Sequence, residues 1–305
     1  MVVEDVEDGG RFGQRPKPGN TSIVPTAPDI HAMRLNEHLS KTANANDITL
    51  DLRCQYAHDG SPPYHLFYHC TDVHFPALST NKLLLLPYSA HHVPTYHTWI
   101  QDPALQAATA SEPLPLDQEY AMQRSWRTDH DKLTFIICRP LPEDHDPSKT
   151  LQAGQHDSAE KMVGDINLFL FEQDSEAEEG HPGPAKLVGE IELMIALPLF
   201  QRQGYGRAAL VTFINYVLSN WPAIAKEYLA GSKSVDAGLP QLDHLRARIN
   251  QTNLRSIALF ENVGFKKTGE KANYFGEVEL RWSGPVEEAR GFRGWEEPKV
   301  LWYRD

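Results

Sequence analysis

The chain has 305 residues, a formal net charge of -12, 41% hydrophobic and 23% charged residues, which is the composition of an ordinary soluble globular protein. The negative charge argues against nonspecific binding to nucleic acid or to an anionic membrane. No apolar run approaches the roughly 18 residues of a membrane span, and the N-terminus lacks the basic start and apolar core of a signal peptide. Three cysteines do not build a disulfide framework, so we expect a cytoplasmic protein.

The first 80 residues show no sustained period of 2 or 3.6. Residues 1–32 are polar and rich in Pro and Gly, and we expect a disordered arm. We interpret residues 33–80 as an irregular N-terminal segment with an insertion at 41–78. Six side chains of that insertion are of metal-binding types, but their spacing fits no standard zinc pattern, so we expect no metal: Cys54, His58, His65, His69, Cys70 and His74.

From Lys82 onward the apolar patterns predict regular secondary structure. The predicted strands are 82–88, 133–138, 163–172, 187–197, 245–249 and 277–282. The predicted helices are 90–102, 116–126, one that ends near 218, and 252–265. The stretch from 218 to about 242 is predicted to be loop. We interpret the histidine pair His91 and His92 as helix surface. This order predicts an α/β fold with a mixed sheet in one domain, 81–283, followed by a C-terminal tail, 284–305.

The segment "PLFQRQGYGRAALVTFINYVL", residues 198–218, places two glycines before a long amphipathic helix. Gly204-x-Gly206-x-x-Ala209 satisfies the dinucleotide-binding pattern, but no second strand ending in an acid follows it. A second interpretation is a plain tight turn. The third is a phosphate site, because the first N–H groups of a helix lack intrahelical partners, and Arg202 and Arg207 add positive charge.

A strand, a Q/R-x-x-G-x-G turn and a helix together resemble the acetyl-CoA site of the GCN5-related N-acetyltransferases (GNAT). The stretch "NLRSIALFENVGF" is similar to the second signature of that superfamily. More closely, "VGDINLFL", "GEIELMIALP" and above all "TASEPLPLDQEYAMQ" resemble the N-acetyltransferase 9 family. The resemblance implies a GNAT-type mixed, mostly antiparallel central sheet flanked by helices, and an enzyme that transfers acetyl from acetyl-CoA to an amine. The implied acceptor is a protein N-terminus or lysine, with tubulin or the microtubule as a partner.

The resemblance also implies site residues. The pyrophosphate of the cofactor would bind the backbone of the glycine turn, and its pantetheine arm would pair with the fourth strand. The implied cofactor-binding residues are Leu193, Met194, Ile195, Gln201, Arg202, Gln203, Gly204, Tyr205, Gly206, Arg207, Asn253 and Ser256. Ser111 and Glu112 lie where the superfamily lines its acceptor groove, although Ser111 could simply end a helix.

Two acidic residues of the fourth strand are candidates for catalysis. Glu190 and Glu192 share one face, because side chains alternate along a strand. Acetyl transfer to an amine needs a group that accepts a proton, so one of them is a candidate general base. The alternative interpretation is an ion pair with Arg246 or Arg248 on the next strand.

The second signature departs from the superfamily at one position. Phe260 stands where many members have a Tyr that protonates the leaving thiolate, so water, another side chain such as Tyr274, or release of a stabilised thiolate would have to replace it. This departure leaves open a non-catalytic module that binds acetyl-CoA or a protein. Apart from Phe260, the sequence also leaves open an acetyltransferase for small amines.

Overall fold

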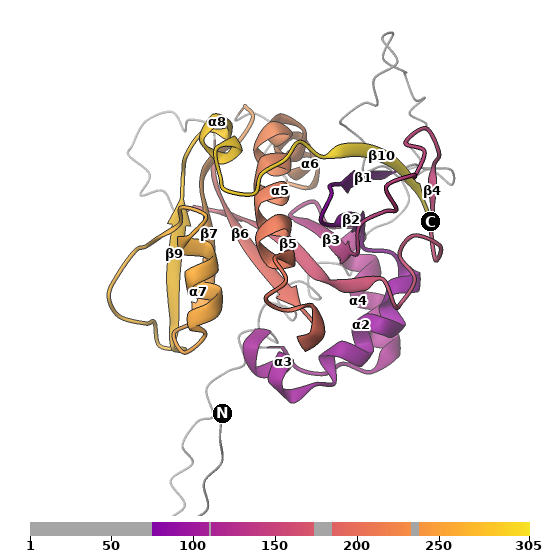
Figure 1. The fold of residues 1–305 in the computed structure, drawn as a ribbon. Coiled ribbons are helices and arrows are strands. Elements are labelled where there is room, and N and C mark those ends of the chain that lie inside the picture. The colour runs from indigo at the N-terminus through magenta and orange to yellow at the C-terminus, as the bar shows by residue number, and fades with distance from the viewer. Residues whose placement is uncertain (1–74, 110, 174–184, 233–237) are drawn as a thin grey trace, which may run out of the picture. The chain divides into compact units, whose positions relative to one another are not determined.

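In the described part of the chain, ten strands form one mostly antiparallel sheet (Figure 1). The computed structural model describes residues 75–109, 111–173, 185–232 and 238–305. Across the sheet the strand order is β4-β10-β1-β2-β3-β5-β6-β7-β9-β8, and only the pairs β4–β10 and β6–β7 are parallel. The strands are β1 (Phe75–Ser79), β2 (Leu84–Pro87), β3 (Lys132–Cys138), β4 (Leu151–Gln152), β5 (Met162–Glu172), β6 (Lys186–Ile195), β7 (Gln241–Asn250), β8 (Lys266–Lys267), β9 (Glu277–Trp282) and β10 (Lys299–Arg304).

Helices cover both faces of this sheet. One face packs against α5, α6, α7 and α8, and the other packs against α2, α3 and α4. The helices are η1 (Ala90–His92), α2 (Val93–Ile100), α3 (Pro103–Thr109), α4 (Leu116–Thr128), η2 (Pro198–Phe200), α5 (Tyr205–Ser219), α6 (Trp221–Gly231), α7 (Leu254–Glu261) and α8 (Val286–Arg290).

The four leucines at 83–86 show why the chain is apolar throughout β2. Leu83 and Leu85 pack in the cluster that includes α5, whereas Leu84 and Leu86 pack in the cluster that includes α2. All four are fully buried. Because successive side chains of a strand point to opposite faces, a sheet covered on both sides needs an uninterrupted apolar run.

The structure confirms the predicted α/β class and the main predicted elements. The strands predicted at 163–172 and 187–197 are the antiparallel pair β5–β6, with register from Gly164↔Ile195 to Glu172↔Leu187. The predicted helix after the glycine turn is α5, in which residues 209–217 are all buried. Gly264 ends the helical segment after α7 with a φ of +99°, which favours glycine.

Three predictions about the ends and connections were wrong. Residues 284–305, expected to be a tail, contain α8 and β10, and β10 pairs with β1 along its length. Residues 75–78, assigned to the insertion, belong to β1, while 41–74 lie outside the described residues. The stretch read as loop after 218 contains α6, because Pro222 lies in the first turn, where proline fits a helix.

Among the described helices, no single one is both long enough and apolar enough to cross a membrane. The pair α5 and α6 meets both conditions only when taken together, and it bends by 73° at the break.

Candidate active site

The parallel strands β6 and β7 run side by side only over their first half. Their pairing begins at Lys186↔Gln241 and ends at Glu190↔Arg246. Beyond that point β6 stays paired with β5, and β7 stays paired with β9. In the described chain, the edge of β6 that faces β7 therefore has no strand partner over 191–195, and its backbone groups can bond an extended ligand. We call this place the strand divergence. The predicted residues Leu193, Met194 and Ile195 lie on it.

The glycine turn begins where β6 ends. The Gln201 side chain donates from Nε2 to the Ile195 carbonyl at 3.1 Å, which ties the turn to the strand. Gly204, with a φ of +90°, is the N-cap of α5, and Arg202 also has a positive φ, of 61°. None of the hydrogen bonds found among the described residues uses the backbone N–H groups of 202–207. These free donors and the helix dipole favour an anion.

Positive charge and free space accompany these donors. The Lys82 ammonium lies 4.6 Å from the ring centroid of Tyr205, the first residue of α5, and the first turn of α5 contains no acidic residue. A Cβ atom at Gly206 would lie 3.3 Å from Leu259 of α7 and 3.7 Å from Leu193 of β6. Glycine therefore keeps open the point where the turn, β6 and α7 meet.

Asn253 and Ser256 form the N-terminal cap of α7. The Asn253 Oδ1 accepts the backbone N–H of Ser256 at 3.2 Å, so Asn253 caps the helix that the sequence predicts at 252–265. α7 carries Leu259, which lines the space beside Gly206. The two residues thus position α7, and their contact with a cofactor stays a prediction.

Glu190 is a buried ion-pair partner. Its side chain is 2% exposed, and its Oε2 lies 2.8 Å from Nε of Arg246 and 3.5 Å from Nε of Arg248. Burial lowers the pKa of Arg246, and the Glu190 carboxylate opposes that shift. The ion pair that the sequence left open is therefore present, and it joins β6 to β7 at their last pair.

Glu192 has a different position on the same strand. It lies beyond the last β6–β7 pair, is partly exposed, and stands opposite Asn167 in the β5–β6 register. Ile191 and Leu193 pack in the cluster that includes α5, whereas Met194 packs in the cluster that includes α2. Glu192 therefore points to the α2 face at the strand divergence, as the predicted alternation requires.

Buried polar side chains gather around Tyr96 on that face. We call the group the Tyr96 cluster, and its members are Tyr88, Tyr96, His97, Glu119, Asp165 and Asn167. The rings of Tyr88 and Tyr96 are 5.4 Å apart. Burial, followed by the charges of Asp165, Glu119 and Glu192, raises the pKa of Tyr96 well above its usual value, so these groups surround it.

Two carboxyl groups of the cluster are nearly inaccessible. Asp165 is 2% exposed, and its Oδ2 accepts a hydrogen bond from the Asn167 amide at 2.7 Å. Glu119 is 1% exposed, and its Oε1 lies 3.8 Å from Nδ1 of His97. Neither residue is among the site residues predicted from the sequence. Polar Asp165 and Asn167 inside the apolar stretch "VGDINLFL" were the available signal.

Asp165 makes the stability of the fold depend on pH. Burial raises its pKa to about 7, against hydrogen bonds from Asn167 and Tyr96 that lower it. The folded chain holds this proton more tightly than the unfolded chain, where the pKa is about 3.9. Protonated Asp165 therefore adds to the free energy of unfolding, and this stabilisation is lost as the pH rises from about 4 to about 7. We expect Asp165→Asn to raise the free energy of unfolding at about pH 8 by roughly 2–4 kcal/mol.

Urea unfolding across that pH range measures this effect. The exposed Asp117→Asn on α4 serves as the control and should leave the midpoint unchanged. A midpoint for Asp165→Asn at or below that of the unmodified chain at the higher pH would contradict the assignment.

The predicted acceptor residues lie between α3 and α4. The Ser111 N–H donates to the Gln106 carbonyl at 3.2 Å, and its hydroxyl bonds that of Thr109, so Ser111 does end a helix. Glu112 is exposed. A substrate role for either residue stays a prediction.

Phe260, which stands at the proton-donor position of the superfamily, and Tyr274, its candidate replacement, lie in different surroundings. Phe260 is 4% exposed and packs edge-on against Phe265, with the ring centroids 5.1 Å apart. Tyr274 is 84% exposed. Phe260 is therefore a core residue, and a role for Tyr274 stays a prediction.

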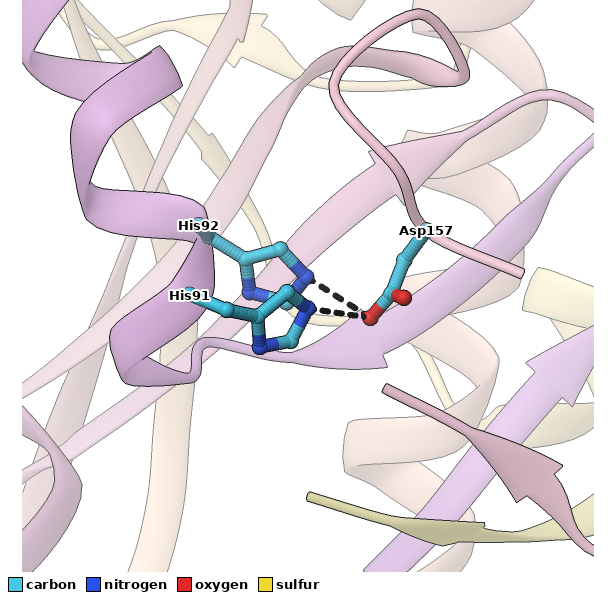
Figure 2. A group of neighbouring side chains, drawn as sticks. All are labelled: His91, His92 and Asp157. Atoms are coloured by element: carbon cyan, nitrogen blue, oxygen red, sulfur yellow. Dashed lines mark hydrogen bonds and ion pairs between the residues drawn. The ribbon is translucent and has the colours of Figure 1, made fainter. Parts of the chain in front are cut away.

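The interpretation of the histidine pair as helix surface holds for His91, which is exposed, and is wrong for His92. His91 and His92 both place Nε2 beside Oδ2 of Asp157, at 2.8 and 2.9 Å (Figure 2). The Tyr303 hydroxyl donates to the same oxygen at 2.6 Å, and His92 is fully buried. Burial alone would raise the pKa of Asp157, but these hydrogen bonds outweigh it and hold the pKa well below its usual range. The contacts join η1 to β10, which the sequence placed in a tail.

These three groups also bring potential metal ligands within 4.8 Å of one another. However, Nδ1 of His92 accepts the N–H of Ser89 at 3.0 Å, so its Nε2 carries the proton and donates to Asp157. A protonated Nε2 cannot ligate a metal, and we interpret the group as a hydrogen-bonded junction. The Cys and His residues between 54 and 74, which are also of metal-binding types, lie outside the described residues.

The chain is similar in sequence to known acetyltransferases. The acetyltransferase (GNAT) domain model matches residues 82–266. The N-acetyltransferase 9-like protein of Schizosaccharomyces pombe is 38% identical over 213 residues, which cover 65% of this chain and 92% of that protein. The alpha/beta-tubulin-N-acetyltransferase 9 of Homo sapiens is 35% identical over 201 residues, which cover 66% and 79%. Among solved structures, a GNAT-family acetyltransferase from Bacillus anthracis has a TM-score of 0.44 and 13% identity, over 69% of this chain and 99% of that one.

The matched domain, on a mostly antiparallel sheet flanked by helices, defines a GNAT acetyltransferase. Within that class the chain belongs to the N-acetyltransferase 9 family, and it is an N-acetyltransferase, as the resemblance of the sequence implied.

Proposed function

We propose that this chain transfers the acetyl group of acetyl-CoA to an amine of a protein, at an N-terminus or a lysine, in the cytoplasm. The observation that carries the proposal is the coincidence of the strand divergence with the free N–H groups at the start of α5. The backbone from Gln201 to Arg207 would hold the pyrophosphate. The free edge of β6 at 193–195 would pair with the pantetheine arm, which brings the thioester to the face of Glu192.

Within this proposal, Glu192 is the general base. It takes a proton from the amine, directly or through water, while the amine nitrogen attacks the thioester carbon. The C–N bond forms, the C–S bond breaks, and the electron pair passes to the sulfur, which takes a proton from water. Glu190 does not take part, because Arg246 and Arg248 hold its carboxylate.

The proposed acceptor is a protein, and tubulin is the first to test. The name of the human relative, alpha/beta-tubulin-N-acetyltransferase 9, supports this choice. A net charge of -12 also favours a cationic amine over an anionic substrate. Ser111 and Glu112 would line the entry to the acceptor site.

Phe260 supports a second candidate, a module that binds acetyl-CoA or a protein without turnover. Its ring cannot protonate a thiolate, and it serves the core instead. Mass spectrometry of tubulin and of cell lysate, after incubation with the chain and isotope-labelled acetyl-CoA, separates the candidates. We expect label on protein amines. Binding of acetyl-CoA without transfer of label would support the module, and label confined to metabolites would indicate a small-amine acetyltransferase.

A further inference from the structure

The Tyr96 cluster contains more buried acceptor oxygens than the described chain satisfies. Among the described residues, Glu119 Oε2, Asp165 Oδ1 and Asn167 Oδ1 have no hydrogen-bond partner, and each of these three residues is less than 5% exposed. The Tyr88 hydroxyl and Nδ1 of His97 in the same cluster also lack a hydrogen-bond partner there, but these two atoms cannot satisfy three acceptors. Buried polar atoms in proteins are nearly always hydrogen-bonded. Three unsatisfied acceptors around one tyrosine indicate a ligand that brings N–H or O–H donors.

The charge of the cluster is also incomplete. None of the interactions found for Asp165 or Glu119 in the described residues involves Lys or Arg, and the one cationic type beside them is His97. Buried carboxylates are normally paired with a cation, because the free energy lost when a carboxylate leaves water is recovered only through such a partner. The ligand that fits is therefore a cation as well as a donor.

A metal ion fits less well than an organic cation. Among the described residues, three potential ligand atoms lie within 4.8 Å of one another at His91, His92 and Asp157, and at no group of carboxylates from the Tyr96 cluster. Their oxygens do not converge as a metal requires. A primary ammonium carries three N–H donors on a longer molecule and can reach separate acceptors.

We propose that Asp165 and Glu119 bind the acceptor amine as its ammonium ion. The ammonium then releases one proton to solvent, and Glu192 takes the second proton from the neutral amine as its nitrogen attacks. The proposal rests on the proposed function and adds residues to its acceptor site. Asp165 stands opposite Met194 in the β5–β6 register, one strand from the divergence. The groups that face it are Tyr88 and Tyr96 on the α2 side and Glu192 on β6, with His97 and Glu119 beyond them.

Kinetics with a synthetic tubulin N-terminal peptide test this assignment. Asp165→Asn and Glu119→Gln should each raise the KM for the peptide about 10-fold or more, as expected for losing a hydrogen bond to a charged group. The KM for acetyl-CoA should change less than about twofold. Asp117→Asn, on the same helix as Glu119 but exposed, is the control and should match the unmodified chain.

Calorimetry adds a readout that a structural role would not move. An arriving ammonium lowers the pKa of Asp165, which burial holds at about 7, so peptide binding to the CoA complex near pH 6.5 should release protons to the buffer. Asp165→Asn should lose that release. An unchanged peptide KM in both variants, or undiminished proton release from Asp165→Asn, would overturn the inference while leaving the proposed function intact. If the unmodified chain acetylates no amine, the proposed function fails instead.

Discussion

Gly206→Val is expected to lower the affinity for acetyl-CoA by about 100-fold or more, equivalent to about 2.7 kcal/mol. A Cβ atom there already lies 3.3 Å from Leu259 and 3.7 Å from Leu193, so the two further methyl groups of valine would fill the point where the turn meets β6. The φ of Gly206 is not positive, so the backbone accepts valine without strain. Equilibrium dialysis with labelled acetyl-CoA measures the change.

Gly269→Val is the matched control, because a Cβ at Gly269 meets no atom within 4 Å. It should bind acetyl-CoA like the unmodified chain. If Gly206→Val binds as tightly as this control and remains folded, the pyrophosphate does not lie at the start of α5.

Glu192→Gln and Glu190→Gln are expected to fail in different ways. Removal of a general base typically costs 10²- to 10⁴-fold in rate, so Glu192→Gln should lower kcat by about that factor and leave stability nearly unchanged. Glu190→Gln should instead lower the free energy of unfolding by roughly 3 kcal/mol, because it leaves the Arg246 and Arg248 guanidinium groups without their buried carboxylate.

Stopped-time acetylation assays and urea titrations of both variants check this division. The two substitutions are isosteric and lie on the same face of one strand, so each is the control for the other. Full turnover in Glu192→Gln would rule out its role as base. A stable Glu190→Gln variant without turnover would transfer that role to Glu190.

The local parts of the site could be predicted from the sequence. The leucines at 83–86, the glycine turn and the Asn253 cap are each determined by a few neighbouring residues, and the structure has all three. The resemblance to the N-acetyltransferase 9 family gave the fold class. These features need no knowledge of distant partners.

Long-range pairing decided the rest. β10 is a short strand whose partners β1 and β4 are far away in the chain. Its own sequence therefore gave no sign of strand pairing, and the segment was predicted to be a tail. Whether Glu190 or Glu192 meets Arg246 depends on the β6–β7 register, which no local pattern specifies. Glu119 lies on a polar helix and became recognisable only when α4 packed on α2 and β3.

Calorimetric titration of acetyl-CoA into the full chain, beside the same titration with NAD, tests the central claim most directly. We expect micromolar binding of acetyl-CoA and no binding of NAD, because the free N–H groups at α5 are combined with a diverging strand pair rather than with a dinucleotide fold. A folded sample that binds no acetyl-CoA would mean that the glycines form only a turn, and the proposed acetyl transfer would have to be abandoned.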